Sequence, residues 1–387
     1  MTISKLLVAN RGEIAARVLR TAKARGLATA VLRHATEQEG PAHLIADEVV
    51  TIDGPTPVAA YLDISQIVEA AKRISADAVH PGYGLLSENA GFAAAVEAAG
   101  LVFIGPEPGA IAMMGSKIEA KAAAEAAGVP VLPGYRGTDQ SDARLLEEAR
   151  ALGTPLLVKA SAGGGGRGMR LVTDLADAPE AIASARSEAK GAFGDAAVFL
   201  ERYAPRARHV EVQVLGDGQG GVVHVFEREC SVQRRFQKIV EETPSPALDA
   251  AKRRDICETA AGIARAIDYR NAGTVEFIFG QGGEYYFLEM NSRLQVEHPV
   301  TEEITGIDLV AEQLRIAAGE SLGYDQTAVT AQGHAIEFRI YAEDAARGYT
   351  PTTGPILVLQ PPQGEGVRWD SGVLQGGEVT SAFDPMI

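Results

Sequence analysis

The sequence predicts a fold of the α/β and α+β classes, in which a parallel N-terminal domain is followed by a mixed and antiparallel C-terminal one. Its 387 residues are enough for two or three domains at roughly 150 residues each. Short apolar runs alternate with amphipathic stretches over the first hundred-odd residues, which is typical of a parallel sheet with helical crossovers. From residue 209 onward the apolar runs lengthen, which is typical of antiparallel strands.

The N-terminal elements follow from the hydrophobic periodicity. Apolar runs predict strands at residues 6–9, 28–32, 48–52, 76–79 and 101–104. Helical spacing of apolar residues predicts helices at 13–25, 64–73 and 92–99. The first strand leads into Asn10, Arg11 and Gly12 without the Gly-x-Gly-x-x-Gly fingerprint, so this turn does not predict a dinucleotide site.

The remaining elements are predicted by the same rules. A helical connector at 117–127 ends at Gly128, Val129 and Pro130, which we take as a domain boundary. A helix at 141–152, strands at 156–160 and 169–172, a helix at 179–190 and a strand at 198–203 come next. Beyond them we predict strands at 209–215, 222–227, 273–279 and 284–291, then one helix at 304–318, and strand and loop from there to the end.

Composition excludes several classes of protein. The net charge of −15 argues against binding to nucleic acid, although a local cluster of cations could still hold a small anion. The only cysteines, Cys230 and Cys257, form no Cys-x-x-Cys pair, which excludes a disulfide scaffold or thiolate zinc site and indicates a reducing compartment. No apolar run reaches the roughly 20 residues of a membrane span, and the N-terminal one is too short for a secretory signal. We therefore expect a cytoplasmic protein.

A glycine-rich segment at residues 163–168 separates two predicted strands. A strand rather than a helix follows it, and no Gly-Lys-Ser/Thr is present, so it fits neither a dinucleotide loop nor a P-loop. Such a loop can instead act as a flap whose backbone N–H groups close onto phosphates, and Lys159 would point at the same phosphates. We expect residues 131–203 to move with it as a lid. The alternative is a plain hairpin tip.

Carboxylates gather on a predicted hairpin around residues 280–283. If these four residues form the turn, Glu276 lies opposite Phe287, and Glu289 and Asn291 share its face. Two carboxylates and an amide form an oxygen-rich site suited to Mg²⁺ rather than to zinc. The alternative is the exposed polar face of an edge hairpin.

A cation, an amide and a carboxylate alternate directly after this hairpin, at Arg293, Gln295 and Glu297. Beside a metal–nucleotide site, the three could hold and deprotonate a small oxyanion. A solvated charge pattern would have the same spacing, so both interpretations stay open here.

Five sequence blocks together resemble biotin carboxylase, the ATP-grasp component of biotin-dependent carboxylases. The blocks are residues 9–15 (ANRGEIA), 80–84 (HPGYG), 163–170 (GGGGRGMR), 230–238 (CSVQRRFQK) and 289–300 (EMNSRLQVEHPV). The resemblance runs from Lys5 to Ile387, and its EMN-x-R-x-QVEHPVTE block is very specific. It implies a Rossmann-like domain at 1–115, a connector at 116–130, an ATP-grasp lid at 131–203 and a C-terminal ATP-grasp/biotin carboxylase domain at 204–387.

The resemblance implies a role for each matching residue. The implied ATP-binding residues are Lys117, Lys159, Gly164, Gly165, Gly166, Glu201, His209, Gln233 and Phe236. The implied Mg²⁺ (or Mn²⁺) ligands are Glu276, Glu289 and Asn291, and the implied bicarbonate-binding groups are Arg293, Gln295 and the Val296 backbone. Glu297 would be the general base, Lys238 would lie near the phosphates and bicarbonate, and Arg339 would stabilise the biotin enolate with Tyr83 nearby.

The implied reaction is the ATP- and bicarbonate-dependent carboxylation of biotin through carboxyphosphate. No Met-Lys-Met biotinylation signature is present, so biotin would arrive on a separate carrier domain or subunit. The resemblance further implies a carboxyltransferase partner, most plausibly of an acyl-CoA carboxylase, and a homodimer. The chain stops at Ile387 where relatives continue, so we expect a fragment of a longer protein.

Two alternatives remain. The chain could be another ATP-grasp ligase, such as a carbamoyl-phosphate synthase half. It could also be a catalytically impaired nucleotide-binding or assembly module, because Phe236 stands where the family usually has His or Asn to contact the ribose. The presence of Lys159, Glu289, Arg293 and Glu297 argues against such decay.

Overall fold

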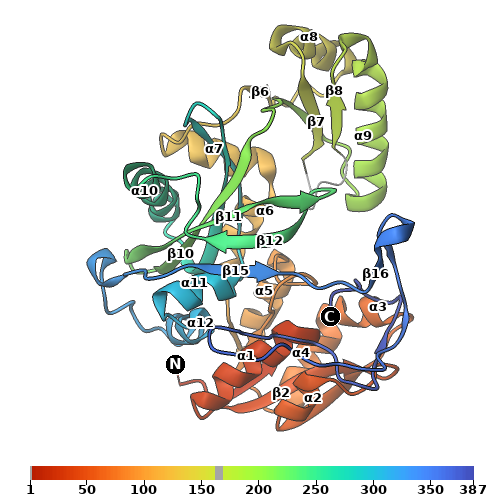
Figure 1. The fold of residues 1–387 in the computed structure, drawn as a ribbon, viewed down its shortest axis with the longest axis vertical. Coiled ribbons are helices and arrows are strands. Elements are labelled where there is room, and N and C mark those ends of the chain that lie inside the picture. The colour runs from red at the N-terminus through yellow and green to blue at the C-terminus, as the bar shows by residue number, and fades with distance from the viewer. Residues whose placement is uncertain (1, 162–168) are drawn as a thin grey trace.

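The computed structural model describes residues 2–161 and 169–387. Its three largest sheets lie in three lobes, with the N-terminal domain at one end, a six-stranded sheet in the middle and a small four-stranded lobe at the other end (Figure 1). Both expected sheet types are present, so the predicted mixture of parallel and antiparallel domains is confirmed. Among the described residues, no helix is both long enough and apolar enough to cross a membrane.

The N-terminal domain is a parallel sheet in the order β3-β2-β1-β4-β5. Its strands are β1 (Lys5–Val8), β2 (Ala28–His34), β3 (Glu48–Ile52), β4 (Ala78–His80) and β5 (Val102–Phe103). Its helices are α1 (Gly12–Ala24), α2 (Pro41–Ile45), α3 (Pro57–Tyr61), α4 (Ile64–Arg73) and α5 (Ala90–Ala98). All five predicted strands and all three predicted helices are present with ends shifted by at most two residues. The short α2 and α3 were not predicted.

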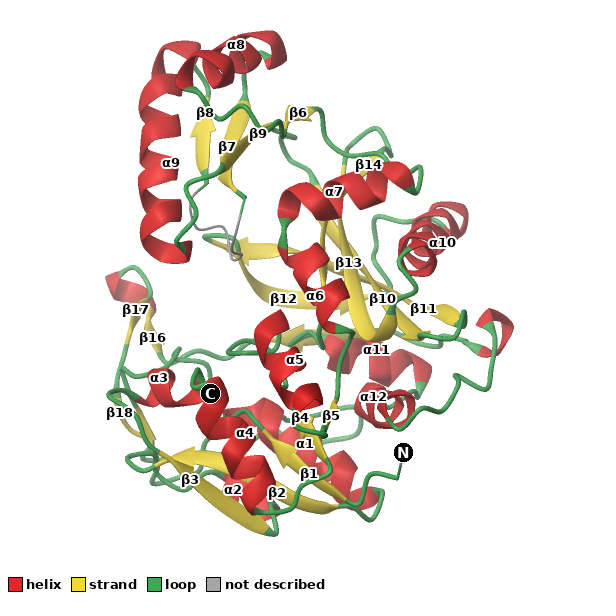
Figure 2. Ribbon diagram, turned by 180° about the vertical axis from the view of Figure 1, so that it is seen from behind, coloured by secondary structure: helices red, strands yellow, loops and turns green. Residues whose placement is uncertain are grey.

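A helical connector leads from this domain to the small lobe. It comprises α6 (Pro108–Gly115) and α7 (Lys117–Ala126). The lobe contains β6 (Gly134–Tyr135), α8 (Asp142–Leu152), β7 (Leu156–Ala160), β8 (Arg170–Val172), α9 (Ala178–Phe193) and β9 (Val198–Arg202). Its sheet order is β6-β9-β7-β8, with antiparallel pairing, and helices α8 and α9 bury their apolar faces against it (Figure 2).

The central sheet is antiparallel, with the order β14-β13-β10-β11-β12-β15. Its strands are β10 (Arg208–Asp217), β11 (Val222–Arg234), β12 (Gln237–Thr243), β13 (Arg270–Phe279), β14 (Tyr285–Asn291) and β15 (Ala335–Phe338). Three helices accompany it: α10 (Ala250–Ala266), α11 (His298–Thr305) and α12 (Leu309–Ala317). The rest of the chain forms β16 (Glu343–Asp344), β17 (Thr350–Pro351), β18 (Gly354–Pro355) and β19 (Glu378–Val379) in a segment that returns to the N-terminal domain (Figure 2).

Two sequence predictions are wrong in this region. Glu276 lies opposite Glu289 rather than opposite Phe287, a difference of two residues. The turn is one residue longer than predicted, so that Phe279 pairs with Tyr285, and an irregularity between Phe277 and Glu276 shifts the register by one more. The single helix predicted at 304–318 is two helices. Gly306 has a left-handed φ of 71° that ends α11, and the Asp308 side chain then caps the start of α12.

Candidate active site

A cavity of about 900 Å³ lies where the small lobe, the central sheet and the N-terminal domain meet. Fifteen of the predicted site residues line it: Tyr83, Lys117, Lys159, Glu201, His209, Gln233, Phe236, Lys238, Glu276, Glu289, Asn291, Arg293, Gln295, Val296 and Arg339. Glu297 pairs with two of them. Gly164, Gly165 and Gly166 lie outside the described residues. Residues spread over more than 250 positions of sequence therefore meet in one place.

A buried cation–carboxylate–cation group stands at the small-lobe end of the cavity. Glu201 on β9 forms ion pairs with Lys159 from β7 and Lys121 from α7, each with an N–O distance of 2.5 Å. Burial alone would raise the pKa of Glu201, but the two lysines outweigh burial and lower it. The sequence analysis missed Lys121, although it follows Lys117 by four positions and so lies on the same face of one helix.

The carboxylate hairpin carries an oxygen-rich group. The Asn291 amide donates to Glu276 Oε1 at 2.8 Å, and Lys117 Nζ lies 2.6 Å from Glu289 Oε2. His209 Nε2 lies 2.8 Å from Glu276 Oε2. Two carboxylates and an amide oxygen within one cavity are the ligand chemistry that Mg²⁺ prefers, so the residues fit this ion.

A second group places a guanidinium beside this hairpin. Arg293 donates to Asn291 Oδ1 at 2.9 Å and to Gln295 Oε1 at 2.8 Å. Gln295 in turn donates to Glu276 Oε1 at 2.9 Å. Residues 292–297, which carry the alternating Arg293, Gln295 and Glu297, are a loop that leads into α11. The guanidinium and the neighbouring amide nevertheless share the cavity wall, where they could hold an oxyanion.

Glu297 is fully buried at the end of this loop and paired with two cations. Lys238 Nζ lies 2.6 Å from its Oε1, and Arg339 Nη2 lies 2.9 Å from its Oε2. Burial alone would raise the pKa of Glu297, but the two cations outweigh burial and hold that pKa well below its usual range. Glu297 is therefore ionised at neutral pH, the state that a general base requires.

Three further residues extend this network and were missed by the sequence analysis. Arg228 Nε donates to Glu211 Oε1 at 2.5 Å, and both side chains are fully buried. Glu211 also contacts Lys238, and Glu241 accepts from Arg339 Nε at 2.7 Å. No motif marks these residues. Glu211 and Arg228 meet because they are direct partners in the β10–β11 register.

Phe236 lies at the rim of the cavity, in a two-residue turn between β11 and β12. Arg235 and Phe236 both have positive φ, at 51° and 66°, a conformation that bulky residues rarely adopt. The Phe236 side chain is 62% exposed. The turn therefore presents an aromatic ring to the cavity and not to the core.

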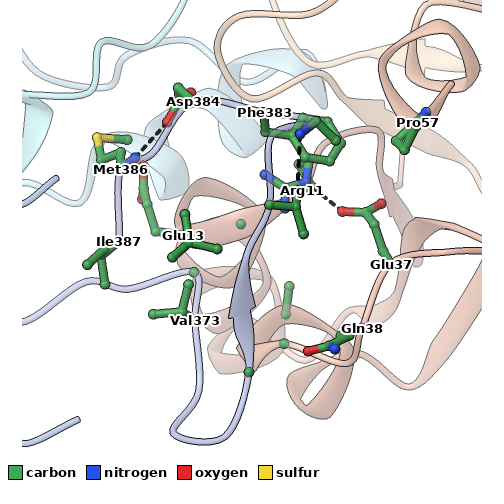
Figure 3. Close-up of a pocket in the computed structure, with 18 of the residues that line it drawn as sticks. Arg11, Glu13, Glu37, Gln38, Pro57, Val373, Phe383, Asp384, Met386 and Ile387 are labelled. Carbon is green, nitrogen blue, oxygen red and sulfur yellow. Dashed lines mark hydrogen bonds and ion pairs between the residues drawn. The ribbon is translucent and has the colours of Figure 1, made fainter. Parts of the chain in front are cut away.

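A second cavity, of about 490 Å³, lies between the N-terminal domain and the C-terminal segment (Figure 3). The Arg11 guanidinium stacks over the Phe383 ring at 3.6 Å and pairs with Glu37 at 2.6 Å. Tyr83 lines both cavities, and none of the other predicted site residues that the structure describes lines this one. The predicted site residues thus concentrate in the larger cavity.

Comparison with known proteins agrees with this geometry. The family model for the biotin carboxylase N-terminal domain matches residues 2–111. The family model for the carbamoyl-phosphate synthase L chain ATP-binding domain matches residues 116–324. The family model for the biotin carboxylase C-terminal domain matches residues 337–387.

Several relatives are similar over the whole chain. Biotin carboxylase 2 of Bacillus subtilis is 48% identical over 99% of this chain and 86% of its own length. The alpha subunit of mitochondrial methylcrotonoyl-CoA carboxylase from Rattus norvegicus is 49% identical over 100% of this chain but only 54% of its own length. The chain thus spans about half the length of that relative.

Solved structures give the same result. A biotin carboxylase from Campylobacter jejuni in complex with an ATP analogue is 42% identical, with a TM-score of 0.97 over 100% of this chain and 86% of that one. The biotin carboxylase domain dimer of 2-oxoglutarate carboxylase from Hydrogenobacter thermophilus, in complex with MgADP and bicarbonate, is 43% identical, with a TM-score of 0.97 over 100% of this chain and 85% of that one. The resemblance expected from the motifs is confirmed: this chain belongs to the biotin carboxylase family.

Proposed function

We propose that this chain carboxylates biotin on a carrier domain at the expense of ATP and bicarbonate, the first half-reaction of a biotin-dependent carboxylase. One observation carries the proposal. Glu297, its two cationic partners, the oxygen-rich hairpin and the Lys159–Glu201 pair all meet in or border one cavity large enough for a nucleotide.

The first step joins bicarbonate to the γ-phosphoryl group of ATP. Arg293 and Gln295 hold the bicarbonate, and Glu297 removes its proton. The oxyanion then attacks the γ-phosphorus and ADP leaves, giving carboxyphosphate. Lys238 and Lys159 offset the charge on the transferring group, where positioning and electrostatics perform most of the catalysis. Mg²⁺ held by Glu276, Glu289 and Asn291 would supply further charge neutralisation when bound.

The second step transfers the carboxyl group to biotin. Carboxyphosphate gives CO₂ and phosphate, and the phosphate takes the proton from the ureido nitrogen of biotin. Arg339 stabilises the enolate oxygen that results, because a guanidinium in a secluded site interacts strongly with developing negative charge. The enolate nitrogen then attacks CO₂. Exclusion of water from this site would protect the labile intermediate.

The domain division expected from the sequence, with boundaries at 115, 130 and 203, is part of this proposal. A biotin carrier and a carboxyltransferase would be its partners, and a homodimer its assembly state. The crystallised biotin carboxylase domain dimer from Hydrogenobacter thermophilus supports the last point. The cytoplasmic location stays a prediction, since the relatives include proteins named as mitochondrial.

The proposed reaction predicts that ATP cleavage depends on bicarbonate and is stimulated by free biotin. The measurement is phosphate release from Mg-ATP with each substrate omitted in turn. Stimulation by ammonia or glutamine in place of biotin would favour a carbamoyl-phosphate synthase half. ATP binding without cleavage under any combination would favour an impaired nucleotide-binding module.

Phe236 predicts weak discrimination between ATP and its deoxyribose counterpart. A phenyl ring makes no hydrogen bond to a ribose hydroxyl, and a neutral hydrogen bond contributes roughly 0.5–1.5 kcal/mol, or about two- to tenfold in affinity. Replacing ATP with its deoxyribose counterpart should therefore lower the affinity of the unmodified protein only slightly. In Phe236→His the same replacement should lower the affinity clearly. Binding titrations of two proteins with two nucleotides measure both effects. A large deoxyribose penalty in the unmodified protein would contradict this role of Phe236.

A further inference from the structure

Two glutamates face each other on neighbouring strands beside Arg339. Glu241 on β12 and Glu337 on β15 are direct partners in the antiparallel register, and β12 and β15 lie side by side in Figure 1. Arg339 follows Glu337 by two positions, so it projects from the same face of the chain. Its Nε donates to Glu241 Oε1 at 2.7 Å, and its Nη2 lies 2.9 Å from Glu297 Oε2.

One oxygen of each glutamate is buried without a donor. Glu241 Oε2 and Glu337 Oε2 accept no hydrogen bond from the described part of the chain, and Glu241 is fully buried. A buried acceptor without a partner is costly, and like charges directly opposite across two strands repel each other. A single proton on the pair removes both costs, because it supplies a donor and neutralises one charge.

The surrounding charges place this proton on Glu337. Burial, and then the charge of Glu241, raise the pKa of Glu337 well above its usual value; Glu297 and Glu13 act in the same direction, and Arg339 opposes them. Burial also raises the pKa of Glu241 to about 7, with Glu297 adding to the rise and the cations Arg339 and Lys238 opposing it. Of the two glutamates, Glu241 is the one that carries the negative charge more easily, because it accepts a hydrogen bond from the Arg339 guanidinium.

We propose that Glu337 is a positioning residue for Arg339: it keeps a proton at neutral pH and donates its O–H to Glu241 Oε2. This hydrogen bond fixes the Glu241 carboxylate, so that its other oxygen holds the guanidinium in the orientation that also reaches Glu297. Loss of the proton would place a second negative charge beside Arg339 and draw the guanidinium away from its working position. The effect on biotin carboxylation rests on the proposed function, whereas the location of the proton does not.

Glu13 is the one rival carrier of a proton near this pair. It lies in the first turn of α1 and lines the second cavity, where it is labelled in Figure 3. Burial, and then the charge of Asp370, raise its pKa to about 8, while Arg339, Arg20 and Arg17 oppose the rise. Any measurement of a buried protonated carboxyl must therefore separate Glu337 from Glu13.

Infrared spectroscopy of the full chain with isotope-labelled glutamate locates the proton. At pH 7 we expect C=O absorption from protonated carboxyls, and Glu337→Gln should remove the part of it that comes from Glu337. The absorption should persist unchanged in Glu242→Gln, a control on β12 beside Glu241 whose side chain pairs with His334 at 3.0 Å. Glu13→Gln identifies any separate contribution of that residue. A missing band in the unmodified protein, or a band unchanged by Glu337→Gln, would overturn the assignment.

The pH profile of biotin-stimulated ATP cleavage tests the positioning role. Gln offers an N–H donor in place of the O–H, so Glu337→Gln should retain turnover within about threefold and lose the decline that the unmodified protein shows as rising pH removes the proton. Glu337→Leu offers no donor and should lose about ten- to a hundredfold in turnover with an unchanged KM for ATP. Equal profiles for the unmodified protein and Glu337→Gln would contradict the proposal. A chain without biotin-stimulated cleavage would contradict the proposed function instead, and the infrared result would still decide where the proton lies.

Discussion

Replacing Glu297 with Gln should lower turnover at least about a hundredfold while nucleotide binding persists, since a positioned general base contributes on that order. The amide fills the same space but accepts no proton from bicarbonate. Its neutral oxygen also releases Lys238 and Arg339 from two ion pairs of 2.6 and 2.9 Å. Steady-state ATP cleavage at saturating bicarbonate, compared with a nucleotide titration, measures the two effects separately.

Glu303→Gln is the matched control. Glu303 lies one and a half turns along α11 and pairs with Arg368 at 3.1 Å on a half-exposed surface. Removing such a surface pair should leave turnover unchanged. Near-normal turnover of Glu297→Gln would exclude Glu297 as the base.

Replacing Arg228 with Met should lower the free energy of unfolding by about 3–5 kcal/mol, the usual loss when one partner of a buried ion pair is removed. Arg228 is fully buried and donates to Glu211, Gln213, Thr274 and Thr301. Met matches its length but satisfies none of these acceptors. Urea denaturation at neutral pH gives the free energy, provided that the transition has a single step.

Arg208→Met on the neighbouring strand serves as the comparison. The Arg208 side chain is half-exposed and meets Glu229 only at 3.4 Å. A surface change of this kind should shift stability by no more than about 0.5 kcal/mol. If both variants lost a similar free energy of unfolding, the burial of Arg228 and its partners would not be the reason for their contribution to stability.

The fold was largely predictable where local pattern and structure agree. The N-terminal strands are short apolar runs between clear turn residues, and all were found. Helix α10 was missed because half of its buried residues are alanines, namely Ala260, Ala261 and Ala264, which weaken the hydrophobic period. The hairpin register was misplaced by two residues, because the turn is one residue longer than predicted and an irregular pairing adds another residue that no sequence signal indicates.

The residue types of the site were predictable, but their pairing was not. Lys121 and Glu201 are separated by 80 positions, and Lys238 and Glu297 by 59. Such contacts depend on how three lobes pack together, which periodicity does not encode. The specific motifs identified which side chains matter, and only the fold shows which cation neutralises which acid.

Lys238 uses all three N–H donors of its ammonium group within the protein. An ammonium has three N–H bonds, and those of Lys238 are directed to Glu211, Glu276 and Glu297. A phosphate oxygen that binds this lysine must displace one of the three carboxylates, so anion binding here is an exchange of partners and not a simple addition. Each carboxylate also has a second basic side chain as a partner: Arg228 for Glu211, His209 for Glu276 and Arg339 for Glu297. A carboxylate that Lys238 releases therefore keeps its other partner. The lysine can then move from a carboxylate to a substrate phosphate at little electrostatic cost.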